Sequence, residues 1–152
     1  MVAMSLGTTE WILAPVVVAL VACISVLAWA ETAIGRTSRA RAAAMVDQLG
    51  PRAERVLRLA SAPERYVNVM LLLLLMLQLT EATLVGVLGA RLFGPVGLVV
   101  ATILNVVVVF VVAEAAPKTW ALEHPESALL AAPLVEMLAG FPPLRWLSRS
   151  LI

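Results

Sequence analysis

Three glutamates interrupt or end the long apolar stretches of this chain, and their side chains are the ones best suited to do chemistry. Glu31 follows the run WILAPVVVALVACISVLAWA, Glu81 lies within a second apolar run, and Glu114 follows a third. Gln78 lies three residues before Glu81, so the two side chains share one face of a helix. Carboxylate and amide oxygens are hard ligands suited to Mg²⁺ or a similar divalent cation. Since acids in membrane spans usually face a bundle interior or water, the pattern predicts a cation site built from several helices.

A structural role for the same residues is the alternative. Glu31 and Glu114 would then lie at the membrane interface, and nearby cations, Arg36 or Lys118, would be their partners. Amide side chains inside the spans would form hydrogen bonds between helices. These amides are Gln78 and Asn105.

The elements that must position these side chains are membrane spans. The 152 residues are 62% hydrophobic and 14% charged, with a mean hydropathy of +0.99, whereas a soluble domain is roughly half apolar and about a quarter charged. Three apolar stretches, 11–30, 66–88 and 95–113, are long enough to cross a bilayer. The short stretch GARLFG joins the last two, which makes them antiparallel neighbours. We therefore expect an all-α integral membrane protein with three transmembrane helices.

The distribution of arginine predicts the orientation of these spans. The connection between the first and second spans contains seven arginines, and the segment before the first span contains none. Short basic loops remain on the cytoplasmic side of a membrane. We therefore expect a multi-pass protein of the cell membrane, embedded in the lipid bilayer, with its N-terminus outside and its C-terminus in the cytoplasm.

Two further helical segments flank the spans. Within 36–65, an alanine-rich stretch ends at Gly50 and Pro51, and a second helix follows with an apolar stripe opposite its arginines. We expect a cytoplasmic helical hairpin of juxtamembrane helices, which either lies on the inner membrane surface or is solvated and only sets the topology. Residues 124–140 are too short and too charged for a fourth span, so we expect a belt helix along the inner leaflet. The stripe consists of Val56, Leu57, Leu59 and Ala60.

Several functional classes lack their signatures in this sequence. No basic stripe with interleaved aromatic residues indicates nucleic-acid binding, and no glycine-rich phosphate loop indicates a nucleotide site. The single Cys23 forms no intramolecular disulfide, and the single His124 is a weak metal signal. There is no paired nucleophile and base and no HExxH motif, so we do not expect an enzyme.

The ends of the first and third spans resemble the CNNM/CorC family of magnesium transporters, many of whose bacterial members are called hemolysin-like. AETAIGRTSRAR is similar to the family's Ser-Gly-Ser-Glu-Thr-Ala motif followed by Ser-Arg-x-Arg, and AEAAPKTWA is similar to its Gly-Glu-x-x-Pro-Lys motif. The resemblance covers nearly the whole chain, as a single transmembrane domain over 1–152. The matching residues are Glu31, Thr32, Ala33, Ser38, Arg39, Arg41, Glu114, Pro117, Lys118 and Ala121.

This resemblance implies a homodimer of three-span subunits with an inward-opening acidic cavity. It also implies an activity, the outward movement of Mg²⁺ coupled to Na⁺, and it makes Glu114 an ion ligand. We expect Gln78, Glu81 and Glu31 to contribute to this metal site together with water. Family members usually continue into a paired CBS module that binds adenine nucleotide, and no such module is present in this chain.

Pro117 and Lys118 acquire a role in this interpretation. Pro117 lacks a backbone donor and should break the third helix just past Glu114, which would free carbonyl groups near the carboxylate. Broken helix ends are places where transporters often coordinate cations. Lys118 would neutralise Glu114 when no ion is bound. The alternative is a simple helix stop followed by an interfacial lysine.

The sequence departs from the family pattern at several expected ligands, and this supports a second hypothesis. Side chains without a ligand oxygen replace the usual serines, and both asparagines of the second span are replaced as well, one by a leucine and the other by a glutamine. A non-transporting membrane scaffold or dimerisation partner with a degenerate ion site would show such losses. The departures are Ala28, Trp29 and Ala30 in the first motif, Leu74 or Leu75 and Gln78 in the second span, and Ala113 before Glu114.

Overall fold

The computed structural model describes residues 8–140, and that part of the chain is helical apart from short turns, which confirms the all-α class. The longest helices are α1 (Thr8–Gly35) and α4 (Pro63–Val108). α4 continues through a π-helical segment, η2 (Val109–Ala115), into α5 (Ala116–Glu123). Four short elements complete the described part. They are α2 (Arg39–Leu49), the 3₁₀ turn η1 (Gly50–Ala53), α3 (Glu54–Ser61) and α6 (Ser127–Ala139).

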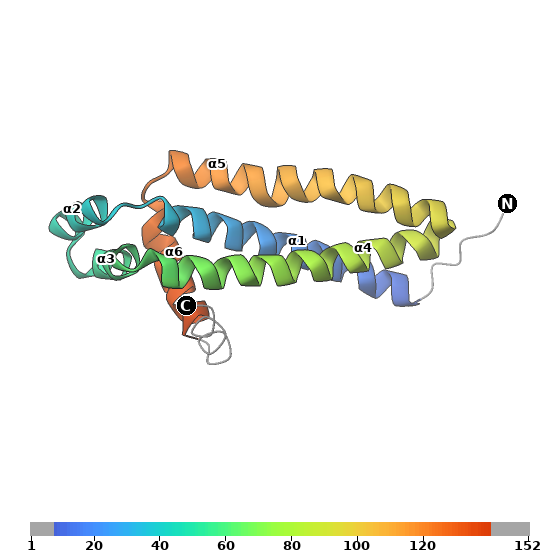
Figure 1. Cartoon of the computed structure of the whole chain (residues 1–152), viewed down its shortest axis with the longest axis horizontal. Helices are drawn as coiled ribbons and strands as arrows, with labels where there is room; N and C mark the ends of the chain where they lie inside the picture. Colours follow the sequence, from blue (N-terminus) through green and yellow to red (C-terminus); the bar gives the residue numbers. More distant parts are fainter. Residues whose placement is uncertain (1–7, 141–152) are drawn as a thin grey trace.

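α4 reverses direction at Gly94, and Figure 1 shows its two arms running antiparallel. Gly94 has a φ of +71°, a conformation that glycine adopts without the steric cost of a Cβ atom, and Pro95 begins the returning arm. Near the turn the arms are so close that a Cβ atom on Gly89 would lie 2.6 Å from the carbonyl oxygen of Gly97. The turn is therefore tighter than the GARLFG stretch suggests, because the helix persists up to Gly94.

Two helical runs, Trp11–Gly35 and Pro63–Glu123, are long and apolar enough to cross a membrane. The second run contains the reversal at Gly94, and the expected spans 11–30, 66–88 and 95–113 all lie inside the two runs. Many large apolar side chains along them point outward, as expected for helices surrounded by lipid tails. Exposed examples are Val18, Leu79, Ile103, Val106 and Phe110.

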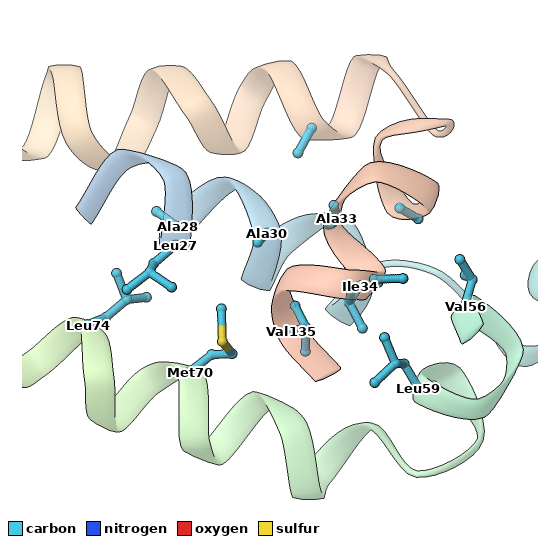
Figure 2. Packing of buried hydrophobic residues seen from close by; sticks show 14 of the residues in the cluster. Leu27, Ala28, Ala30, Ala33, Ile34, Val56, Leu59, Met70, Leu74 and Val135 are labelled. Carbon is cyan, nitrogen blue, oxygen red and sulfur yellow. The ribbon is translucent and has the colours of Figure 1, made fainter. Parts of the chain in front are cut away.

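Alanines form much of the core between α1 and its neighbours. Ala28, Ala30 and Ala33 are buried on α1, and they face a region where Met70 and Leu74 of α4 are also buried (Figure 2). α1 contacts α4, η2, α5 and α6. Small side chains allow helix backbones to approach closely, which is how helices associate in lipid. The alanines of the first-span motif therefore have a packing role.

The connection after α1 contains two short helices, α2 and α3, joined by η1. Ser38 begins α2, since its side-chain oxygen accepts a hydrogen bond from the backbone N–H of Arg41. Gly50 ends α2 with a φ of +65°, and Pro51 follows in η1. The chain then continues into α3. The sequence predicted the end of α2 at Gly50 and Pro51, whereas the cap at Ser38 was not anticipated.

The apolar stripe of α3 faces protein, which neither sequence-based interpretation of this hairpin anticipated. Val56 and Leu59 are fully buried, and Figure 2 places them near Ile34 at the end of α1 and Val135 of α6. α3 also contacts α2. The burial of these side chains anchors the hairpin to the end of the bundle.

α6 crosses the end of the bundle and contacts α1, α3 and α4 (Figure 1). It is three residues shorter at its start than the predicted 124–140, because Pro125 and Glu126 lie in the preceding turn. Pro133 is accommodated inside the helix. Leu130 and Met137, seven residues apart, are both exposed. An apolar outer face of this kind agrees with the expectation of a belt helix, which remains a prediction.

Candidate functional site

Two carboxylates and the chain's single lysine meet where α1 and α5 lie side by side. Nζ of Lys118 lies 3.9 Å from Oε2 of Glu31 and 3.9 Å from Oε2 of Glu114. Both glutamates are partly buried. The contact predicted between Lys118 and Glu114 is therefore present, and the same ammonium group also pairs with Glu31 from another helix. Two acids that are 83 positions apart in the sequence face one cation.

Gln78 connects this group to the first arm of α4. Its Nε2 donates a hydrogen bond to Oε1 of Glu114. Lys118 approaches Oε2 of that glutamate, so the two oxygens have different partners. The amide and the ammonium group together fix the orientation of the Glu114 carboxylate.

Pro117 does not end the third helix, and the expectation that it breaks the helix just past Glu114 is wrong. The chain stays helical to Glu123. Only the spacing of the backbone hydrogen bonds differs, since η2 is π-helical and not α-helical. The N–H of Ala116 bonds to the carbonyl of Val111, five residues back. Because proline has no N–H, a π-helical turn absorbs the missing donor without ending the helix.

One carbonyl of η2 does find a partner in α1. At five-residue spacing, Pro117 would have to donate to Val112, and it cannot. Oγ of Ser25 lies 3.5 Å from the Val112 oxygen and 2.9 Å from the carbonyl of Val21 on its own helix. The hydroxyl has a single hydrogen and its shorter contact is to Val21, so the contact with Val112 is a weak one. Sequence reasoning did not single out Ser25, since a serine in an apolar span carries no distinct signal.

A pocket of about 280 Å³ opens beside Glu31 and Lys118. Glu31 and Lys118 line it, together with the hydroxyl-bearing Thr32 and with Arg36. The Thr32 hydroxyl lies 3.5 Å from Oε2 of Glu31. The remaining walls are Gly35, Val67 and Leu122. The pocket therefore combines a carboxylate, a hydroxyl and cationic groups that can compete for the acids.

Glu81 has a partner other than the lysine group. Its side chain is only 1% exposed, and Nδ2 of Asn105 donates a hydrogen bond of 2.8 Å to its Oε2. Its Oε1 is buried without a hydrogen-bond partner in residues 8–140. Asn105 lies on the returning arm of α4, so this bond joins the two arms. The four predicted site residues thus divide into two polar groups, with Glu31, Gln78 and Glu114 in one and Glu81 in the other.

Aromatic stacking accounts for His124, which sequence reasoning treated as a weak metal signal. Its ring stacks on that of Trp120 with centroids 4.4 Å apart, and its Nδ1 lies 3.0 Å from the Trp120 carbonyl oxygen. The Trp120 ring lies 6.2 Å from that of Trp29. Trp29, which replaces a glycine of the family motif, therefore belongs to an aromatic group beside the site.

The described residues contain no group of three or more histidine, cysteine, aspartate or glutamate side chains placed to hold a metal ion. Two carboxylates lie beside Lys118, the Thr32 hydroxyl lies beside Glu31, and the Gln78 amide bonds to Glu114. Mg²⁺ is commonly held by one or two carboxylates while it keeps several of its waters. The arrangement is therefore suited to a hydrated ion and unsuited to a fully dehydrated one.

These features define an all-helical membrane domain with a polar site where several helix ends converge. The model of the cyclin M transmembrane N-terminal domain, CNNM, matches residues 15–151. The chain therefore belongs to the CNNM family, which confirms the resemblance inferred from its motifs. This is a family of membrane transporter type, broadly linked to divalent-cation transport, and is not known as an enzyme family.

A curated relative agrees with this assignment. The UPF0053 inner membrane protein YfjD of Escherichia coli strain K12 is 34% identical to the chain over 122 residues. The match covers 77% of this chain and 28% of YfjD, so the chain spans just over a quarter of the length of that relative. The similarity concerns the membrane domain, and it supports a membrane location for this chain.

Proposed function

We propose that this chain moves divalent cations, above all Mg²⁺, across the cell membrane, and that it works as a homodimer. The observation that carries the proposal is the placement of one ammonium group, Nζ of Lys118, 3.9 Å from a carboxylate oxygen of both Glu31 and Glu114. Two carboxylates thus face a common point that attracts a cation. Membership of the CNNM family supports a divalent ion as the substrate.

In this proposal the ion replaces the lysine. A hydrated Mg²⁺ enters the pocket beside Glu31 and Glu114, and the ammonium group of Lys118 moves away from them. The doubly charged ion is attracted more strongly than the ammonium group, and the lysine remains close enough to return. Competition of this kind keeps the affinity modest, which a transported ion requires because it must also leave.

The polar groups on α4 continue the path away from the pocket. Gln78 bonds to Glu114, and Glu81 with Asn105 lies closer along the helix to the turn at Gly94. With the orientation predicted from the arginines, the pocket opens to the cytoplasm. Mg²⁺ would then move outward past these groups, and Na⁺ moving inward would supply the driving force.

Mg²⁺ binding to the purified protein tests the proposal. Calorimetry should detect saturable binding to the wild type, and Glu114→Gln should weaken it at least about tenfold through loss of a carboxylate ligand. Asp47→Asn is the matched control, because Asp47 is an exposed acid on α2 away from the pocket. Equal weakening in both variants would contradict a site at Glu114. Proteoliposomes with an internal Mg²⁺ indicator then measure transport.

A non-transporting scaffold with a degenerate site is the second candidate, and one observation favours it. Lys118 pairs with both acids and offsets one of their two negative charges, and Gln78 satisfies the other oxygen of Glu114, so the oxygens of this group have partners without an ion. Buried polar groups that satisfy one another can serve packing alone. Absence of Mg²⁺ binding at millimolar concentration, in a protein that is folded and dimeric, would select this candidate.

A further inference from the structure

A second pocket lies away from the candidate cation site, between the corner that joins α2 to α3 and the side of α6. Its volume is about 740 Å³. The walls include Leu49, Arg52, Arg55, Leu129, Leu130 and Pro133. One part of this groove is cationic and the rest is apolar, whereas the pocket beside Lys118 also contains the carboxylate of Glu31.

The cationic part has charge that the residues in 8–140 do not fully neutralise. Arg52 is exposed and forms no ion pair with any residue in 8–140. Nε of Arg55 lies 3.7 Å from Oε2 of Glu136, whose other oxygen lies 2.9 Å from Nη2 of Arg58. One carboxylate is thus shared by two guanidinium groups. Residues 36–65 contain seven arginines and three acids, a net charge of +4, so an anion is attracted to this side.

The apolar part of the groove would be left in water by a small anion. Leu49 is 50% exposed and Leu130 is 66% exposed. The groove also lies at the end of the bundle where the apolar helices stop, since α1 ends at Gly35 and α4 begins at Pro63. Lipid headgroups are expected at this level of a bilayer. A ligand that fills the whole groove must therefore be amphiphilic, with an anionic end and a hydrocarbon end.

We propose that this groove binds a phospholipid with an anionic headgroup. The phosphate accepts hydrogen bonds from the guanidinium groups of Arg52 and Arg55, which match phosphate geometry. An acyl chain lies along Leu129, Leu130 and Pro133 of α6. Bound lipid holds the α2–α3 corner and α6 together at the membrane surface. Basic pockets beside membrane helices are typical sites for anionic headgroups. This site is independent of cation transport and shares no residue with the pocket beside Lys118.

Native mass spectrometry of the full chain, released from micelles that contain phosphatidylglycerol or phosphatidylcholine, tests this site. We expect wild-type protein to retain phosphatidylglycerol in preference to phosphatidylcholine. Arg52→Gln should lower phosphatidylglycerol occupancy about tenfold, because a charge-assisted contact is lost. Arg39→Gln should leave it within about twofold, since Arg39 is exposed on α2 but does not line the groove. Leu130→Asn should also lower phosphatidylglycerol occupancy, because it removes part of the apolar wall.

Three results would overturn the proposal. Equal losses in Arg52→Gln and Arg39→Gln would mean diffuse attraction to a basic surface. Equal retention of the two lipids by the wild type would mean that the headgroup charge is not recognised. Displacement of the lipid by an equal concentration of glycerol phosphate would mean that the groove takes a soluble phosphate. Mg²⁺ binding to Arg52→Gln, measured in parallel, separates this proposal from that of the cation site.

Discussion

Nζ of Lys118 lies 3.9 Å from Oε2 of Glu31, and this contact joins α5 to the end of α1 in the wall of the pocket that both residues line. Lys118 reaches Glu114 on the preceding turn at the same distance. A lysine that holds two carboxylates in this way opposes any other cation that approaches them. The effect of this competition on Mg²⁺ affinity can be measured directly.

Lys118→Met should tighten Mg²⁺ binding. Removal of the competing ammonium group leaves two carboxylates without their cation. The gain in Mg²⁺ binding free energy should be about 1 kcal/mol in a solvated site, or roughly fivefold in Kd. Calorimetry on the purified protein measures this change, and Arg39→Gln controls for a general loss of positive charge. Weaker binding in Lys118→Met would mean that the lysine organises the acids for the ion and does not compete with it. Transport by this variant should slow if ion release limits the rate.

Pro117→Ala should lower the affinity for Mg²⁺ without lowering the stability of the fold. An alanine restores the N–H, so η2 can return to regular α-helical spacing, and a shift of one residue turns Glu114 by roughly 100° about the helix axis. We expect Mg²⁺ affinity to fall roughly fivefold, or about 1 kcal/mol, while the unfolding temperature is unchanged or higher. Pro133→Ala, in α6, is the control. Unchanged affinity would show that the π-helical segment does not position the carboxylate.

Asn105→Leu should destabilise the α4 hairpin through Glu81. The substitution would leave both buried oxygens of Glu81 without a partner, at a cost of about 1–3 kcal/mol. The double variant Glu81→Leu with Asn105→Leu should recover most of that stability, because an apolar pair needs no hydrogen bonds. Thermal unfolding in detergent, followed by circular dichroism, measures both. If the double variant were no more stable than Asn105→Leu, the pair would not be coupled.

Gly89→Ala should disrupt the close approach of the two α4 arms. The new Cβ atom would lie 2.6 Å from the side chain of Ala101 and 2.6 Å from the Gly97 carbonyl oxygen, so the arms must separate. We expect a loss of about 1–3 kcal/mol in the free energy of unfolding. Gly35→Ala is the control, since its Cβ would meet its nearest neighbour at 3.7 Å, an ordinary contact. Equal stability of the two variants would contradict the tight packing near the turn.

Much of the fold follows from local features of the sequence. The length of the apolar runs predicted the long helices, Gly50 and Pro51 predicted the end of α2, and the GARLFG stretch predicted a reversal. The meeting of Glu31 and Glu114 also follows from the sequence, because antiparallel spans of similar length bring the end of the first and the end of the third to the same side. Two motifs at these span ends were enough to indicate the family.

The partners of individual polar side chains could not be predicted in this way. The bonds Gln78–Glu114 and Asn105–Glu81 depend on how each helix is rotated about its axis. A helix that is apolar on all sides carries no stripe to indicate that rotation. The tertiary contacts decide it, and among them is the packing of the small alanines of α1, which sets how closely the helices approach.

The sequence by itself therefore determined the long helices, the reversal within GARLFG and the class of membrane domain, since these depend on local hydrophobicity and backbone preference. Only the tertiary structure decided that Pro117 is absorbed by a π-helical turn, that the stripe of α3 packs on α6, and that Glu81 is separate from the lysine group. Each of these outcomes depends on contacts between residues distant in the sequence. Their energies depend on which surfaces the folded chain brings together, and no local pattern records that.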